Sequence, residues 1–235
     1  GKLCVEGKTT LDLEHALNLT GGNIFHGLLS WPWLEDDSRA WDTSRVTYMD
    51  HMFDGATAFD RDISDWNTSQ VVDMQYMFSG AFFANPLYTG QAELPESILS
   101  PSHFNQDITR WNTSSVTTFA GMFLDNTSFN QEINRNLRTG SWNTSSAIDM
   151  GDMFGGASAF NADISGWSTT NVKIMSSMFA GAAAFNHDLR YTPATRYSPS
   201  AWDTRNVIAM GSMFAEATAF NGDISNWKTG NVRSE

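Results

Sequence analysis

The fold is decided by a stretch that recurs along the chain, FNADISGWSTTNVKIMSSMFAGAAAF at residues 160–185. One tryptophan marks each copy: Trp41, Trp66, Trp111, Trp142, Trp167, Trp202 and Trp227. The spacings between them are 25, 45, 31, 25, 35 and 25 residues, which is a base period of 25 with three insertions. A fixed period of this size predicts a solenoid, in which each repeat buries its apolar face against its neighbours.

The second half of each copy predicts a short amphipathic helix. Apolar residues follow each tryptophan at plus five and plus eight, and a Met-Phe pair such as Met178-Phe179 follows at plus eleven and plus twelve. Steps of three, three and one place these side chains on one helical face. A threonine two residues after each tryptophan, such as Thr169, is expected to cap the helix. The Gly-Ala pair near its far end, such as Gly181-Ala182, is expected to allow close packing or a left-handed stop.

The first half of each copy predicts a strand. The segment around Phe-Asn-x-Asp-Ile-Ser is too short for a helix and carries one strongly β-prone residue, so we interpret it as a strand with a single ladder. The predicted order of elements in each repeat is therefore strand, turn, helix, turn. The residues therefore predict an α/β solenoid of ~25-residue repeats with a short parallel sheet on one face.

The pattern F-N-x-D-I-S-x-W-N-T-S-x-V-x-x-M-x-x-M-F-x-G-A resembles the repeat of the BspA-like, Mycoplasma-type surface-protein family. That family is a divergent branch of the leucine-rich repeats and is catalogued as a domain of unknown function. The resemblance covers roughly residues 41 to 232. It implies a right-handed leucine-rich-repeat-like solenoid on a secreted or cell-surface microbial protein, and it brings no catalytic residues with it.

Two parts of the chain differ in pattern. Residues 1–40 do not follow the repeat and predict an N-terminal helical cap over the first repeat, with a helix at residues 9–17. Residues 41–235 predict about six full repeats and a partial seventh, with insertions near 84–103, 134–140 and 190–200. Because the last copy is incomplete, we expect either that the array continues in the native protein or that another chain covers its end.

The last two insertions form the first candidate binding site. Both fall in the short link between the predicted strand and the tryptophan, so they are expected to emerge from one edge. They carry Arg135, Arg138, Arg190, Tyr191, Arg196 and Tyr197. Arg and Tyr are typical of interfaces, and insertions on one face of a repeat protein often bind its partner. The alternative is that surface loops tolerate any polar residue.

A column of acidic residues, one in each repeat, is the second candidate site. Its members are Asp62, Asp107, Glu132, Asp163, Asp188 and Asp223. Strands in register would place these carboxylates about 4.8 Å apart, and such a ladder either attracts a cation such as Ca²⁺ or is relieved by hydrogen bonds. An Asn stands two residues before most of these acids, so we favour a hydrogen-bonded Asn-Asp network over a metal site.

Five sequons are candidate glycosylation sites: Asn18, Asn67, Asn112, Asn126 and Asn143. Asn67, Asn112 and Asn143 directly follow a tryptophan, so glycans there would line a single edge. The same slot is also the position expected of a plain polar cap.

Composition excludes several function classes. The net charge of −12 disfavours nucleic acid as a partner, because phosphate binding needs a basic surface. No apolar run approaches the ~18 residues needed for a membrane span. The single Cys4 supports neither a disulfide framework nor a cysteine metal cluster. We find no catalytic motif, and we expect no enzymatic activity.

These observations predict a non-enzymatic, extracellular or cell-surface repeat protein that mediates recognition or adhesion. The expected partner is a protein, a glycan or copies of the same chain. A structural subunit of an extracellular filament, cell coat or virion is the main alternative. A hydrolase is the least favoured hypothesis, because it would need a deep pocket that a thin solenoid seldom offers.

Overall fold

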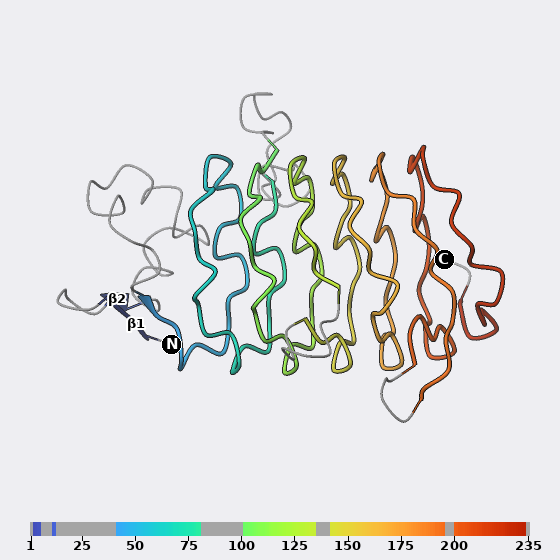
Figure 1. Cartoon of the computed structure of the whole chain (residues 1–235), viewed down its shortest axis with the longest axis horizontal. Coiled ribbons are helices and arrows are strands. Elements are labelled where there is room, and N and C mark those ends of the chain that lie inside the picture. Colours follow the sequence, from blue (N-terminus) through green and yellow to red (C-terminus); the bar gives the residue numbers. More distant parts are fainter. Residues whose placement is uncertain are drawn as a thin grey trace.

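The computed structural model describes residues 2–5, 11–12, 41–80, 101–134, 142–195 and 200–233. Coils of the chain lie side by side along the longest axis of the molecule and follow one another in sequence order, from blue to red (Figure 1). Successive coils are joined by parallel bridges between residues that stand seven positions after a tryptophan. The bridged residues are Tyr48, Asp73, Thr118, Asp149, Ile174 and Ala209. One coil therefore corresponds to one repeat.

The strands in the described ranges are short and lie at the N-terminal end of the stack. They are β1 (Lys2–Val5), β2 (Leu11–Asp12) and β3 (Trp41–Asp42), which form an antiparallel sheet in the order β2-β1-β3. Strand β3 begins the first coil, so β1 lies along the first coil. Strand β2 falls inside the helix predicted at residues 9–17, which makes that helix wrong. Most of the predicted cap lies outside the described residues.

Helices are absent from the described ranges, and none of these residues belongs to a helix that could span a bilayer. The predicted α/β solenoid of strand-turn-helix repeats is therefore wrong. The predicted parallel sheet is also wrong, since the coils are joined by isolated bridges, and these fall in the segment that the spacing assigned to a helix.

Hydrogen bonding between coils explains why this segment is not helical. The N–H groups of Met150, Asp152 and Phe154 donate to carbonyls of the next coil at 2.9–3.0 Å. The N–H groups of Met153 and Gly155, which follow Asp152 and Phe154, close tight turns onto carbonyls three residues earlier at 3.3 and 3.0 Å. An α-helix instead bonds each N–H to the carbonyl four residues earlier in the same segment. The repeated three-residue turns reproduce the apolar spacing that resembles a helical face.

Two positions of the coil have a left-handed backbone, the first in six coils and the second in five, which a right-handed helix cannot contain. The position ten residues after the tryptophan has φ of 52–59° in His51, Tyr76, Gly121, Asp152, Ser177 and Ser212. The position fourteen residues after it has φ of 53–72° in Gly55, Asp125, Gly156, Gly181 and Glu216. The glycine of the Gly-Ala pair therefore supplies a left-handed turn within the coil and does not stop a helix.

Stacked rings fill the core between the coils. Trp142 and Trp167 lie 6.1 Å apart with their planes 3° from parallel, and the phenylalanines of the Met-Phe pairs stack in the same way, as Phe154 does on Phe179 at 5.8 Å. These side chains are fully buried. Each ring contributes a large buried apolar area, so the prediction that each repeat buries its apolar residues against its neighbours is confirmed.

The threonine column joins neighbouring coils through its hydroxyl groups. Thr113 is fully buried, and its Oγ1 accepts a hydrogen bond from the N–H of Asn143 at 2.7 Å and donates to the Asn143 carbonyl at 3.2 Å. Thr204 makes the same pair of bonds to Lys228 at 2.8 and 3.2 Å. The prediction that these threonines cap helices is wrong, because their partners belong to the next coil.

The asparagine column replaces the predicted strand ladder. The Oδ1 atom of Asn130 accepts from the N–H of Asn161 at 2.8 Å, and Asn161 accepts in turn from Asn186 at 2.9 Å. A side-chain carbonyl thus takes the role that a backbone carbonyl has in a sheet. This arrangement connects the coils without forming a strand in Phe-Asn-x-Asp-Ile-Ser.

Candidate binding edge

The two C-terminal insertions leave the stack at the same corner of the coil. Trp142 and Trp202, which follow the insertions, have positive φ values of 24° and 47°, and their N–H groups donate to the carbonyls of Trp111 and Trp167 at 3.0 and 3.1 Å. Where no residues are inserted there, the Trp N–H closes a turn, as Trp167 does onto Ile164 at 3.0 Å. The chain therefore re-enters the stack after each loop with the same backbone geometry at the tryptophan.

The base of the second loop is held by paired hydrogen bonds. The N–H of Tyr191 donates to Asn226 Oδ1 at 2.8 Å, and Asn226 Nδ2 donates to the Tyr191 carbonyl at 3.0 Å. Thr192 and Ala201 exchange two backbone bonds at 3.0 Å each. The loop thus enters and leaves through a short antiparallel contact. Four candidate residues lie outside the described residues: Arg135, Arg138, Arg196 and Tyr197.

The two arginines that the structure describes at this edge, Arg190 and Arg205, are held in ion pairs. The side chain of Arg190 is 57% exposed, and its Nε lies 3.3 Å from Asp223 Oδ2. Arg205 binds Asp203 through Nε and Nη2 at 2.9 and 2.5 Å, and its guanidinium carbon lies 5.7 Å from the centre of the Tyr191 ring. The hydrogen bonds from Arg205 hold the pKa of Asp203 below its ordinary value.

Sequence reasoning singled out Arg190 and Tyr191 but missed Asp203, Arg205 and Asn226. The signal available for Asp203 was an acidic residue in the slot that directly follows the tryptophan. No pattern in the sequence indicated that Arg205 and Asn226 contact Tyr191, because their positions depend on the register between coils.

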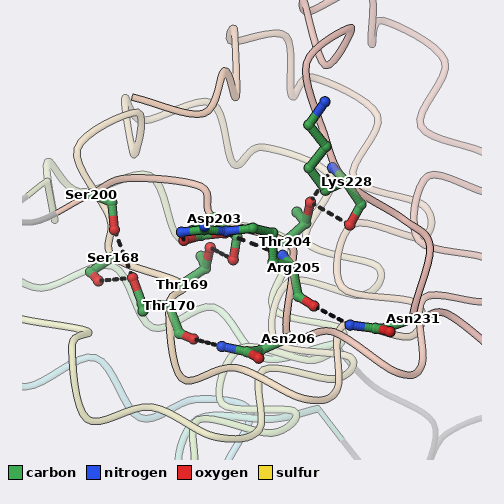
Figure 2. A network of polar contacts seen from close by, with 10 residues as sticks. All are labelled: Ser168, Thr169, Thr170, Ser200, Asp203, Thr204, Arg205, Asn206, Lys228 and Asn231. Atoms are coloured by element: carbon green, nitrogen blue, oxygen red, sulfur yellow. Dashed lines mark hydrogen bonds and ion pairs between the residues drawn. The ribbon is translucent and has the colours of Figure 1, made fainter. Parts of the chain in front are cut away.

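Figure 2 shows how a polar network ties this edge together across coils. Thr170 Oγ1 and Ser200 Oγ lie 2.8 Å apart, and Asn206 Nδ2 donates to the Thr170 carbonyl at 2.8 Å. Asn231 Nδ2 of the following coil donates to the Arg205 carbonyl at 2.7 Å. The exposed side chains of the edge are therefore mounted on a backbone that is fixed from both sides.

The acidic column is used for local backbone bonding. The carboxylates of Asp62, Asp107, Asp163 and Asp223 each accept the N–H two residues later at 2.8–3.0 Å, as in Asx turns. The N–H of Asp223 also donates to Asp188 at 2.8 Å. Glu132 is exposed. Within the described ranges, no three His, Cys, Asp or Glu side chains gather in a group that could hold a metal ion.

The sequon asparagines differ in accessibility. Asn67 is exposed, Asn112 and Asn143 are half-buried, and each accepts the N–H two residues later at 3.1 Å. Asn126 is fully buried, and its Nδ2 donates to the Phe104 carbonyl at 3.0 Å. The folded chain therefore does not present Asn126 to a glycosyltransferase. Asn18 lies outside the described residues.

Comparison with known proteins gives one family and a few short matches. A family model described as "Mycoplasma protein of unknown function, DUF285" matches residues 23–137, 96–196 and 193–235. Uncharacterized proteins of Mycobacterium bovis and Mycobacterium tuberculosis are 61% identical over 36 residues, which is 15% of this chain and 7% of each relative. The chain thus spans a small fraction of these relatives. No solved structure matches the chain.

Proposed function

We infer the function from the premise that this chain belongs to the family described as Mycoplasma protein of unknown function, DUF285. The match confirms the family to which the repeat pattern points. Since that family carries no assigned activity, the function has to be argued from the binding edge.

We propose a non-enzymatic recognition module, secreted or displayed on the cell surface, that binds a protein or a glycan through the corner of the coils where the two loops leave the stack. The observation that carries this proposal is the shared geometry of Trp142 and Trp202. A left-handed tryptophan at both places is a costly conformation, and such conformations concentrate at functional sites.

The chemistry of the edge supports recognition over catalysis. Arg190 and Tyr191 combine an exposed cation with an aromatic ring, which is a frequent combination at interfaces. The repeated Asp, Asn and Thr side chains described above form hydrogen bonds to the backbone. We therefore assign these side chains a structural role and not a catalytic one.

The test is binding of the labelled chain to an array of glycans and extracellular proteins. The double variant Arg190→Ala, Tyr191→Ala is expected to lose the signal of the unmodified chain. Arg110→Ala is the matched control, because Arg110 is 77% exposed and directly precedes Trp111 in a coil that has no loop at that corner. Absence of any binding, or equal binding by the double variant, would contradict the proposal.

A structural subunit of a filament, cell coat or virion is the second candidate. Light scattering on dilution separates the two candidates, because a structural subunit should remain assembled and a recognition module should be monomeric.

A further inference from the structure

The outer surface of the first two coils carries rings where the other coils carry small or acidic residues. The position ten residues after the tryptophan is occupied by His51 and Tyr76 in these coils, and by Gly121, Asp152, Ser177 and Ser212 in the later ones. The backbone there is left-handed in every coil. Gly, Asp and His tolerate this conformation, whereas a bulky residue such as Tyr rarely adopts it. Tyr76 therefore has a disfavoured conformation beside the His51 ring, which points to a use for the Tyr76 ring.

Neighbouring groups hold these two rings in place. The rings of His51 and Tyr76 stack with centroids 4.9 Å apart and planes 16° from parallel. The Tyr76 ring lies against Gly121 of the third coil, in the space that a Cβ atom there would need. His51 Nδ1 lies 3.0 Å from a carboxylate oxygen of the buried Asp54, which also accepts from the hydroxyl of Ser79. The rings are therefore fixed across three coils.

An exposed tyrosine and two carboxylates complete this surface. Tyr48 is 64% exposed, and the parallel bridge places it beside Asp73 of the next coil. The carboxylate of Asp73 accepts from the backbone and side-chain nitrogens of Gln75 at 2.9 and 3.4 Å. Burial raises the pKa of Asp73, and the charge of the exposed Asp50 raises it further. A cation at this place would relieve that repulsion.

The negative charge of the surrounding coils favours a positively charged partner. Residues 41–80 contain seven Asp residues and two Arg residues. The face of the exposed Tyr48 ring and the carboxylates attract guanidinium and ammonium groups, whereas the Tyr76 ring lies between His51 and Gly121 and holds His51 in place. We propose that the aromatic-acidic face, formed by Tyr48, Asp50, His51, Asp73 and Tyr76, binds an Arg or Lys side chain on a basic segment of another protein. This face is separate from the loop edge, so the proposal holds whether or not the loops bind.

The test is calorimetric titration of the folded chain with a hexa-arginine peptide. Tyr48→Ala is expected to weaken binding about tenfold, since a partly desolvated cation-π contact is worth about one order of magnitude in affinity. Asp50→Asn is expected to weaken it about threefold, since an exposed ion pair contributes less. Ile148→Ala and Asp107→Asn are the matched controls, because Ile148 is also exposed, at 48%, and Asp107 is an exposed acid elsewhere on the coils. Both controls are expected to bind as tightly as the unmodified chain.

A further variant separates binding from folding. Tyr76→Asn places a residue that tolerates the left-handed conformation at this position, so it is expected to weaken binding while leaving the thermal midpoint unchanged or higher. A lower midpoint together with weaker binding would show that the ring serves the fold, and would overturn its place in the binding face.

Three other results would overturn the proposal. The first is a lack of saturable binding. The second is equal weakening by the face variants and the controls, which would show that diffuse negative charge attracts the peptide. The third is self-association of the chain that the peptide displaces, which would make a second copy the occupant in place of a basic segment of another protein.

Discussion

Removing one hydroxyl of the threonine column tests how the coils are joined. The variant Thr113→Val keeps the shape of the side chain but deletes the two bonds that Thr113 makes to the N–H and carbonyl of Asn143 at 2.7 and 3.2 Å. Each bond contributes about 1 kcal/mol, and buried groups left without partners cost about 1–3 kcal/mol more. We therefore expect a loss of about 2–4 kcal/mol in the free energy of unfolding.

The assay is urea unfolding followed by tryptophan fluorescence. A loss near 3 kcal/mol corresponds to a midpoint about 1 M lower if the slope is about 3 kcal/mol/M. Thr113→Ser keeps both bonds and loses one methyl group, worth about 0.8 kcal/mol. Thr47→Val changes an exposed threonine and should shift stability by less than about 0.5 kcal/mol. If Thr113→Val proved no more harmful than Thr113→Ser, the inter-coil role of the hydroxyl would be refuted.

Three more predictions concern the stacks, the left-handed turns and the buried acids. Trp167→Ala removes a fully buried ring and should cost about 3–5 kcal/mol in urea unfolding; a loss below about 1 kcal/mol would contradict the stacking. Gly156→Ala should lower the thermal midpoint, because φ is +66° and the added Cβ would meet Asp125, whereas Gly230→Ala, with no atom within 4 Å, should not. Burial raises the pKa of Asp152 above 3.8, so its charge costs stability at neutral pH and that cost vanishes at pH values below the unfolded-state pKa. Asp152→Asn should therefore raise the thermal midpoint at pH 7 but not in acid, and an equal gain at both pH values would count against this account.

The repeat and its core could be predicted from the sequence because they depend on composition at fixed spacing. The tryptophans and the Met-Phe pairs recur at positions that stacking must bury, whatever the backbone between them does. The structure buries Trp167, Met178 and Phe179 accordingly. The family was likewise predictable from the repeat pattern alone.

The backbone of the coil was not predictable from apolar spacing, because steps of three and four residues arise from successive tight turns as well as from a helix. The competing signal lay in the residues at the left-handed positions. Gly121, Asp152 and Gly156 tolerate positive φ, and such residues at fixed places inside a supposed helix are evidence against it. The hydrogen bonds of Thr113 to the next coil could not be predicted, since a helix cap and a bond between coils both require a threonine hydroxyl.

The corner at which the two loops leave the stack was predictable, but the residues that contact the second loop there were not. The place of the insertions before Trp142 and Trp202 indicated one corner. The contacts of Tyr191 with Asn226 and with Arg205 depend on which residues of successive coils face each other. That register is set by inter-coil hydrogen bonds across repeats of unequal length, which a single sequence does not show.

Far-UV circular dichroism of the purified chain tests the central claim most directly. That claim is that the repeats are non-helical coils joined by backbone and side-chain ladders. We predict a spectrum without the double minimum of the α-helix. A strong helical double minimum would contradict the account, because it would require the segments after each tryptophan to form the helices that the apolar spacing alone suggests.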